Sequence, residues 1–145
     1  MVAGLRACHF AGRDIEEFLF SMDKQAFYRQ AAALVQAQAY GEAKARLTAF
    51  LSAHPADEIA CSIYGSVLLR QNKTVEALEV FAKNSKRHPS SWAALADLGF
   101  AAMKTGDADL ALTSFEAVVA RNPGFYLAWS NLERLYFDRQ DFGAA

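Results

Sequence analysis

The equal spacing of the three prolines is the feature of this sequence that most constrains its fold. Pro55, Pro89 and Pro123 stand 34 residues apart, and they are all the prolines of the 145 residues. Proline breaks a helix, so each one marks a boundary at the same place in a repeated unit. The spacing therefore predicts copies of one short structural unit.

Further columns of residues keep the same register. They hold small side chains, alanines, and large apolar or aromatic side chains: Ala31, Gly65 and Gly99; Ala43, Ala77, Ala111 and Ala145; Leu47, Phe81 and Phe115. Alanine is common in this chain, so the alanine column alone is weak evidence. The proline, small-residue and aromatic columns together make the repeat strong.

Residues 92–125 show what one unit contains. Leu95, Leu98, Gly99 and Ala102 form a helical stripe with the spacing i, i+3, i+4, i+7. Gly106 then suits a left-handed residue just past the end of a helix. A second apolar run ends before the next proline, so the unit reads as two helices joined by a tight turn.

A 34-residue period of helix–turn–helix units is typical of the tetratricopeptide repeat, and the chain resembles that family over residues 24–145. The best matches to the family pattern are Trp129, Leu132 and Tyr136; Leu98, Gly99, Ala111, Phe115 and Pro123; and Gly65, Ala77, Phe81 and Pro89. Gln30, Asn84 and Glu133 depart from the pattern, because each is polar where the family packs an apolar or small side chain.

The resemblance implies an all-α solenoid of antiparallel helix pairs wound as a right-handed superhelix. We expect one domain over residues 1–145, with repeats at 24–57, 58–91 and 92–125 and a partial fourth at 126–145. The expected helices are 24–38 and 41–53, 58–71 and 74–87, 92–105 and 108–121, and 126–139. Thr74, and Ser90 or Ser91, are the expected N-caps.

Residues 1–23 are expected to form a leader. Asp14 can cap a helix that carries Ile15, Phe18, Leu19 and Met22 on one face. Such a helix would pack on the first repeat as an N-terminal cap. The alternative is a poorly ordered leader.

Composition excludes several classes of protein. A hydrophobic fraction of 53% with 21% charged residues indicates a globular chain, and the net charge of −1 argues against nucleic-acid binding. No apolar run reaches the roughly 18–20 residues of a membrane span. Cys8 and Cys61 are too few for a disulfide framework or zinc site. The start lacks a secretory signal, so a cytoplasmic location is the default, although a mature periplasmic protein would look the same.

We find no pattern for catalysis, and we expect neither an enzyme nor a cofactor or metal. His54 and His88 directly precede repeat prolines, where an imidazole suits the negative end of a helix dipole. The basic run Lys86–His88 is likewise expected to complement the negative end of a helix dipole. Cys61 falls at an inward position and is expected to be a small buried residue.

In this family the first helices line a concave face that binds other proteins. The corresponding positions also include Val35, Ile59 and Leu127, and the predicted partner-binding residues are Tyr28, Arg29, Ile63, Ser66, Leu69, Arg70, Asp97, Phe100, Met103, Lys104, Asn131, Arg134 and Phe137. Phe100 and Met103 are the best candidate anchors. The alternative is that they pack between neighbouring first helices.

One subset of the family holds the C-terminal carboxylate of heat-shock chaperones with lysine, asparagine and arginine. Here the equivalent positions hold Tyr28, Ala32, Ile63, Ala93 and Asp97, so that clamp is absent. The predicted function is therefore a protein-interaction scaffold or adaptor whose groove binds an amphipathic helix or extended apolar peptide.

Two other functions stay open. Trp129, Tyr136 and Phe142 are aromatic where an outermost repeat is usually polar. Either the natural chain continues beyond Ala145, as the N-terminal arm of a larger enzyme such as a bacterial transferase, or a second copy covers this surface in a self-assembling element. A secretion or assembly chaperone belongs to the binding class.

Overall fold

The computed structural model describes the backbone of residues 4–143 and the side chains of residues 20–140. Over that range the chain is helical and contains no strand. The helices are α1 (Gly4–Gln36), α2 (Tyr40–Ala53), α3 (Glu58–Arg70), α4 (Thr74–Arg87), α5 (Trp92–Thr105), α6 (Ala108–Arg121) and α7 (Tyr126–Gly143). The all-α prediction is confirmed, and the expected bounds from α2 to α6 hold within one residue.

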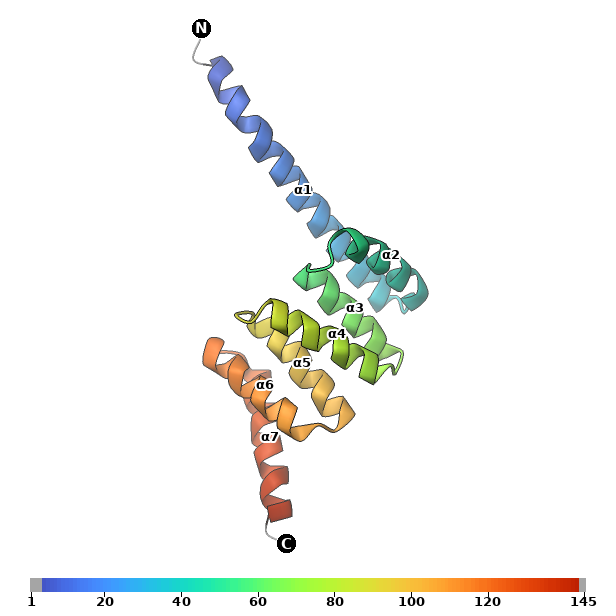
Figure 1. Ribbon diagram of the computed structural model, residues 1–145, viewed down its shortest axis with the longest axis vertical. Coiled ribbons are helices and arrows are strands. Elements are labelled where there is room, and N and C mark those ends of the chain that lie inside the picture. The colour runs from blue at the N-terminus through green and yellow to red at the C-terminus, as the bar shows by residue number, and fades with distance from the viewer. Residues whose placement is uncertain (1–3, 144–145) are drawn as a thin grey trace.

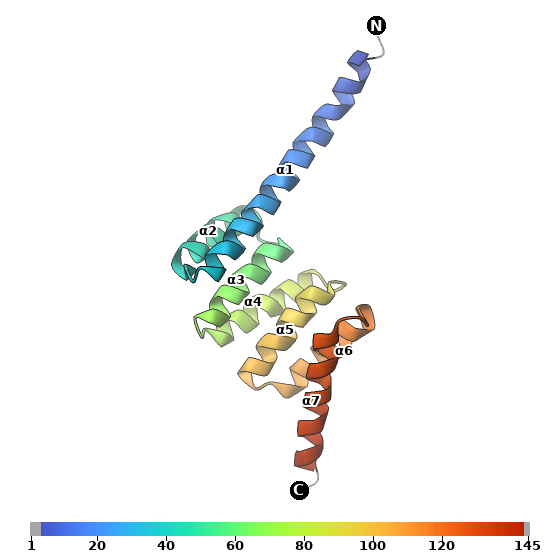
Figure 2. The ribbon, with the colours of Figure 1, turned by 180° about the vertical axis from the view of Figure 1, so that it is seen from behind.

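The helices stack in two layers. Figures 1 and 2 show α1, α3, α5 and α7 on one side and α2, α4 and α6 on the other. Each second-layer helix packs between two helices of the first, and neighbouring first-layer helices also touch where α1 meets α3 and α3 meets α5. This is the predicted solenoid of helix pairs. We call the layer of α1, α3, α5 and α7 the inner layer.

The apolar core runs along the whole stack as three linked clusters. One joins α1, α2 and α3, the next joins α3, α4 and α5, and the last joins α5, α6 and α7. Each cluster shares a helix with its neighbour. No helix pair closes a core alone, so the repeats depend on one another for burial.

An aromatic ring on a glycine closes each of the two best-matched helix pairs. The rings of Phe81 and Phe115 are fully buried. They lie against Gly65 and Gly99, where an added Cβ would come within 2.3 Å and 2.9 Å of the ring carbons. The glycines at these two positions therefore leave the space that the aromatic rings occupy. In the first pair the buried Ala31 and Leu47 occupy these registers.

The turns between paired helices share one backbone feature. Gln38, Asn72 and Gly106, spaced 34 residues apart, have φ angles of 61°, 60° and 82°. These are left-handed conformations, which glycine and asparagine adopt most readily. The prediction for Gly106 is confirmed.

Among the helices whose first residues have described side chains, α3, α5 and α6 begin with a side-chain cap. Asp57, Ser91 and Asp107 accept a hydrogen bond from the backbone N–H three residues later, at 2.9–3.2 Å. The prediction for Ser91 is confirmed. The prediction for Thr74 is wrong, because α4 has Lys73 at its N-cap and Thr74 is its first helical residue.

The prediction of a separate leader helix is also wrong. Helix α1 runs without a break from Gly4 to Gln36 and joins the leader to the first helix of repeat one. Figure 1 shows its N-terminal part extending away from the stack rather than folding onto it. No glycine or proline stands between Asp14 and Gln36, so the sequence offers nothing to end the helix there. The side chains of Ile15, Phe18 and Leu19 lie outside the described residues.

We predict that Gly65→Ala and Gly99→Ala each lower the free energy of unfolding by about 1–3 kcal/mol, because the new methyl group collides with a buried ring. Urea denaturation measures this. Gly41→Ala is the matched control, since nothing lies within 4 Å of the added Cβ. It should leave stability unchanged or raise it by up to about 1 kcal/mol. Equal effects at all three glycines would contradict the packing described.

Candidate functional site

The predicted partner-binding residues all lie on the inner layer. Their side chains divide by exposure. Half-buried are Tyr28, Ile63, Ser66, Leu69, Asp97, Phe100, Met103 and Asn131. Exposed are Arg29, Arg70, Lys104, Arg134 and Phe137. The layer therefore presents basic side chains together with a partly buried apolar floor.

The two candidate anchors are largely committed to the core. The ring of Phe100 packs edge-on against Phe115, with 5.2 Å between centroids. Met103 packs against the same cluster, and its sulfur lies 4.0 Å from the Arg134 guanidinium. More accessible apolar side chains on this layer are Ile59, which is 45% exposed, and Leu127, which is 57% exposed.

A column of contacts joins neighbouring inner-layer helices near the starts of α3, α5 and α7. Lys24 forms an ion pair with Asp57 at 3.2 Å, and Ser91 donates a hydrogen bond to Glu58. Trp92 packs against Phe125 with 4.9 Å between ring centroids. The members of every pair are 33 residues apart. Sequence reasoning missed this column, although that constant offset is its signal.

Asp57 is the most connected member of the column. Its carboxylate accepts hydrogen bonds from the Tyr28 hydroxyl at 2.6 Å and from Lys24. Burial alone would raise the pKa of Asp57, but hydrogen bonds from Tyr28, from the backbone of Ala60 and from Lys24 hold it below the ordinary value of 3.8. Burial and the same carboxylate raise the pKa of Tyr28. The predicted groove residue Tyr28 thus ties α1 to α3.

A cavity of about 120 Å3 lies between α3 and α5. Its lining residues are Glu58, Ile59, Ser62, Ile63, Asn84, Ala93, Ala94 and Asp97. The Ser62 hydroxyl donates to the Asp97 carboxylate at 2.5 Å. Burial raises the pKa of Asp97, the Ser62 hydrogen bond opposes this, and the nearby charge of Glu58 adds to the rise. A carboxyl group whose charged form is disfavoured by burial thus lines an open space.

The departures at Gln30, Asn84 and Glu133 have different outcomes. Gln30 and Glu133 are exposed, so they disturb no packing. Asn84 is 1% exposed and donates its amide to the carbonyl of Glu58 at 3.1 Å. Its Oδ1 atom is buried and has no hydrogen-bond partner. Asn84 is thus a buried polar group that ties α4 to the start of α3.

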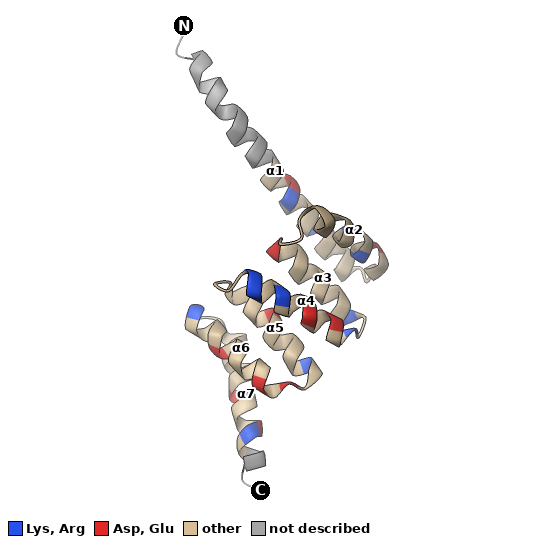
Figure 3. Ribbon diagram, viewed as in Figure 1, with Lys and Arg blue, Asp and Glu red and all other residues tan. Residues whose placement is uncertain are grey.

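Two members of the basic run Lys86–His88, at the end of α4, make contacts within the fold. Figure 3 shows acidic residues near the start of α4 and basic residues near its end, the arrangement that suits a helix dipole. Arg87 donates to the carbonyl of Pro55 at 2.6 Å, and the His88 ring lies 2.8 Å from the carbonyl of Ala56. These contacts fasten the end of α4 to the loop between α2 and α3. Cys61 is buried, as predicted.

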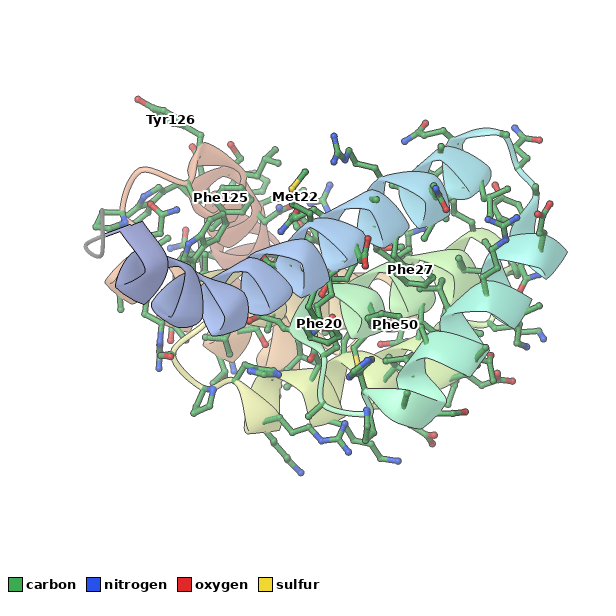
Figure 4. The ribbon with its side chains drawn as sticks, turned by 90° about the horizontal axis from the view of Figure 1, so that it is seen from above. Phe20, Met22, Phe27, Phe50, Phe125 and Tyr126 are labelled. Carbon is green, nitrogen blue, oxygen red and sulfur yellow. The ribbon has the colours of Figure 1, made fainter. Side chains whose placement is uncertain are left out.

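His54 belongs to an aromatic cluster where α1 meets α2. Phe27 stacks on Phe50 with 4.2 Å between centroids, and His54 contacts both Phe50 and Phe20. Figure 4 shows Phe20, Phe27 and Phe50 gathered on this side. Phe20 is 51% exposed, and Lys24 lies 5.1 Å from its ring centroid.

The described residues contain no group of three acidic, histidine or cysteine side chains suited to a metal ion.

Helix α7 leaves large apolar side chains uncovered. Tyr126 is 83% exposed, and Trp129, Tyr136 and Phe137 are 49%, 44% and 62% exposed. Trp129 donates to the carbonyl of Pro123 at 2.8 Å, and Tyr136 donates to Glu116. The expected aromatic surface is therefore present, while Phe142 lies outside the described side chains. Across the described residues, none of the helices has the length and apolarity to cross a membrane.

Comparison with known proteins agrees with the geometry. The sequence pattern of the family described as "Tetratricopeptide repeat" matches residues 28–91, 85–124 and 96–145. No curated protein sequence matches the chain significantly.

Several solved structures share the fold. The Sgt2 tetratricopeptide domain from Aspergillus fumigatus superposes with a TM-score of 0.77 at 20% identity, covering 83% of this chain and 82% of that one. The first such domain of Spaghetti (RPAP3), bound to an HSP90 peptide, gives 0.74 at 17%, covering 80% and 92%. The Yersinia enterocolitica type III secretion translocator chaperone SycD gives 0.71 at 14%, covering 79% and 92%. At these identities the likeness shows the fold alone.

We predict that Asp57→Ala lowers the free energy of unfolding at pH 7 by about 1–2 kcal/mol, because the cap of α3 is lost. The folded-state pKa of Asp57 is depressed, so its carboxylate stabilises the fold above pH 3.8 and loses that effect as the pH falls further. The difference between wild type and variant should therefore shrink in acid. Urea denaturation from pH 7 to pH 3 measures it, and a difference independent of pH would contradict the assignment.

Proposed function

The chain belongs to the tetratricopeptide repeat family, and from that premise we propose that it is a scaffold that binds a peptide or helix of a partner protein along its inner layer. Repeats of this kind are generally non-catalytic binding scaffolds. The similar RPAP3 domain is bound to a peptide, which supports the same role here. The observation that carries the proposal is the exposure of Ile59 and Leu127 on this layer.

The charges along the layer favour a peptide of mixed character. Glu58 and Asp97 lie in the first half of their helices, whereas Arg70 and Lys104 lie in the last turns. The first helices run in the same direction across the layer, so its charge changes from acidic at Glu58 and Asp97 to basic at Arg70 and Lys104. An amphipathic helix or extended apolar segment with a basic group on one side fits this pattern.

An acidic chaperone tail does not fit. A clamp for a carboxylate needs cations or amides near the middle of the layer. Tyr28, Ile63 and Asp97 stand at those positions, and Asp97 would repel an acidic ligand. The proposed partner is therefore of a different chemical class from the HSP90 peptide of the RPAP3 domain.

Self-association through α7 is a second candidate function, and the exposed aromatic side chains of this helix favour it. We predict that the mean molar mass in light scattering rises with protein concentration and that Trp129→Glu prevents the rise. Val75→Glu, at a side chain 65% exposed on α4, should not prevent it. A constant monomer mass over the concentration series would exclude this function.

We predict that Ile59→Glu together with Leu127→Glu weakens peptide binding at least about tenfold, because a charge replaces apolar contact at two places. The probe is a set of peptides selected from a random phage-displayed library against the wild-type chain. Val75→Glu is the control and should bind normally, since Val75 lies on α4, in the layer of α2, α4 and α6.

Circular dichroism checks that all these variants fold. Failure to select any peptide, or selected peptides that bind the double variant as tightly as the wild type, would overturn the proposal. The test avoids Phe100 and Met103, whose core contacts would confuse lost binding with lost stability.

A further inference from the structure

The cavity between α3 and α5 has the form of a pocket for a single side chain. Its volume of about 120 Å3 is several times the roughly 10–15 Å3 that one water molecule requires. Ile59, Ile63 and Ala93 supply apolar walls, and Ile59 and Ala93 are exposed, so the cavity is reached from the inner layer. A ligand lying along that layer can therefore place a side chain in it.

The polar groups of this pocket are nearly all hydrogen-bond acceptors. Asp97 and Glu58 contribute carboxylates from neighbouring helices. Asn84 reaches the pocket from α4 behind them. Because its amide group donates to the Glu58 carbonyl, the orientation of the side chain is fixed and the atom left over is the oxygen.

The oxygen of Asn84 is further evidence, beyond the shape of the pocket, that a ligand binds there. Asn84 is 1% exposed, and its Oδ1 lacks a partner. An unpaired buried acceptor costs free energy, so a donor that enters the pocket would be favoured there. The Ser62 hydroxyl already donates to Asp97, which leaves acceptor capacity on the carboxylate.

From this geometry we infer that the pocket binds the ammonium group of a lysine side chain from the partner peptide. An ammonium group has three donors and no acceptor, which matches Asp97, Glu58 and the Asn84 oxygen. The aliphatic stem of lysine suits the walls formed by Ile59, Ile63 and Ala93. The inference rests on the proposed function and names the residue that the groove selects.

The neighbouring groups assign most of the recognition to Asp97 and Asn84. Glu58 already accepts from Ser91 and lies 3.9 Å from the His88 ring, so part of its charge is engaged. Lys24 is paired with Asp57. Burial raises the pKa of Asp97, and a bound ammonium group would supply the opposite charge that this carboxylate lacks.

The test is a titration of the 15N-labelled chain with N-acetyl-lysine N-methylamide, followed by NMR. We expect saturable shifts of the Asn84 side-chain amide and of the backbone amides of Ser62 and Asp97. The norleucine analogue has a similar stem without the charge, and it should cause no such shifts at the same concentrations.

Two variants separate the pocket from general charge effects. Asp97→Asn keeps an acceptor for Ser62 and should weaken binding about tenfold or more, since a hydrogen bond to a charged group is lost. Asp109→Asn makes the same change at an exposed site on α6 and should leave the affinity unchanged. Ala93→Leu fills the pocket without touching its acceptors and should also prevent binding.

The NMR spectrum itself shows whether each variant is folded. Equal shifts with the norleucine analogue, shifts confined to other helices, or an unchanged affinity in Asp97→Asn would overturn the inference. Peptide binding is measured separately with the Ile59 and Leu127 variants. A groove that binds peptides with a pocket that ignores lysine would therefore refute this inference and leave the proposed function intact.

Discussion

The contact of an aromatic ring with a glycine is the interaction on which the rest of this structure depends. Phe81 on Gly65 and Phe115 on Gly99 bring the helices of two consecutive pairs into close contact. The close approach of the paired helices lets the core clusters continue from one repeat to the next through shared helices. The inner layer, with its cavity and its change of charge from one side to the other, follows from the regular stacking that these contacts impose.

Much of this architecture could be predicted because it repeats. Columns such as Pro55, Pro89 and Pro123 fix the period, and the helix pattern of one unit then locates the others. The sequence pattern did not predict that the leader and the first helix of repeat one form one continuous helix, because the family pattern describes only the repeat. A search for helix breakers between Asp14 and Gln36 would have found none.

The site was less predictable, because its important contacts join residues of different helices that lie far apart in the sequence. The pairs of Lys24 with Asp57 and of Glu58 with Ser91 depend on an offset of 33 residues rather than the period of 34. The pocket unites α3, α4 and α5, and its key oxygen belongs to Asn84, which in sequence looked like a flaw in packing. Whether a side chain such as Phe100 faces a ligand or the core depends on packing geometry that periodicity alone does not give.

A double-mutant cycle at Gly65 and Phe81 tests the central claim most directly. The buried Ala31 and Leu47 occupy the same registers in the first pair, so alanine with leucine is a natural alternative to glycine with phenylalanine. The account predicts that Phe81→Leu removes most of the penalty of Gly65→Ala, with a coupling of about 1 kcal/mol or more in urea denaturation. Additive effects of the two substitutions would show that ring and glycine do not act together, and would contradict the account.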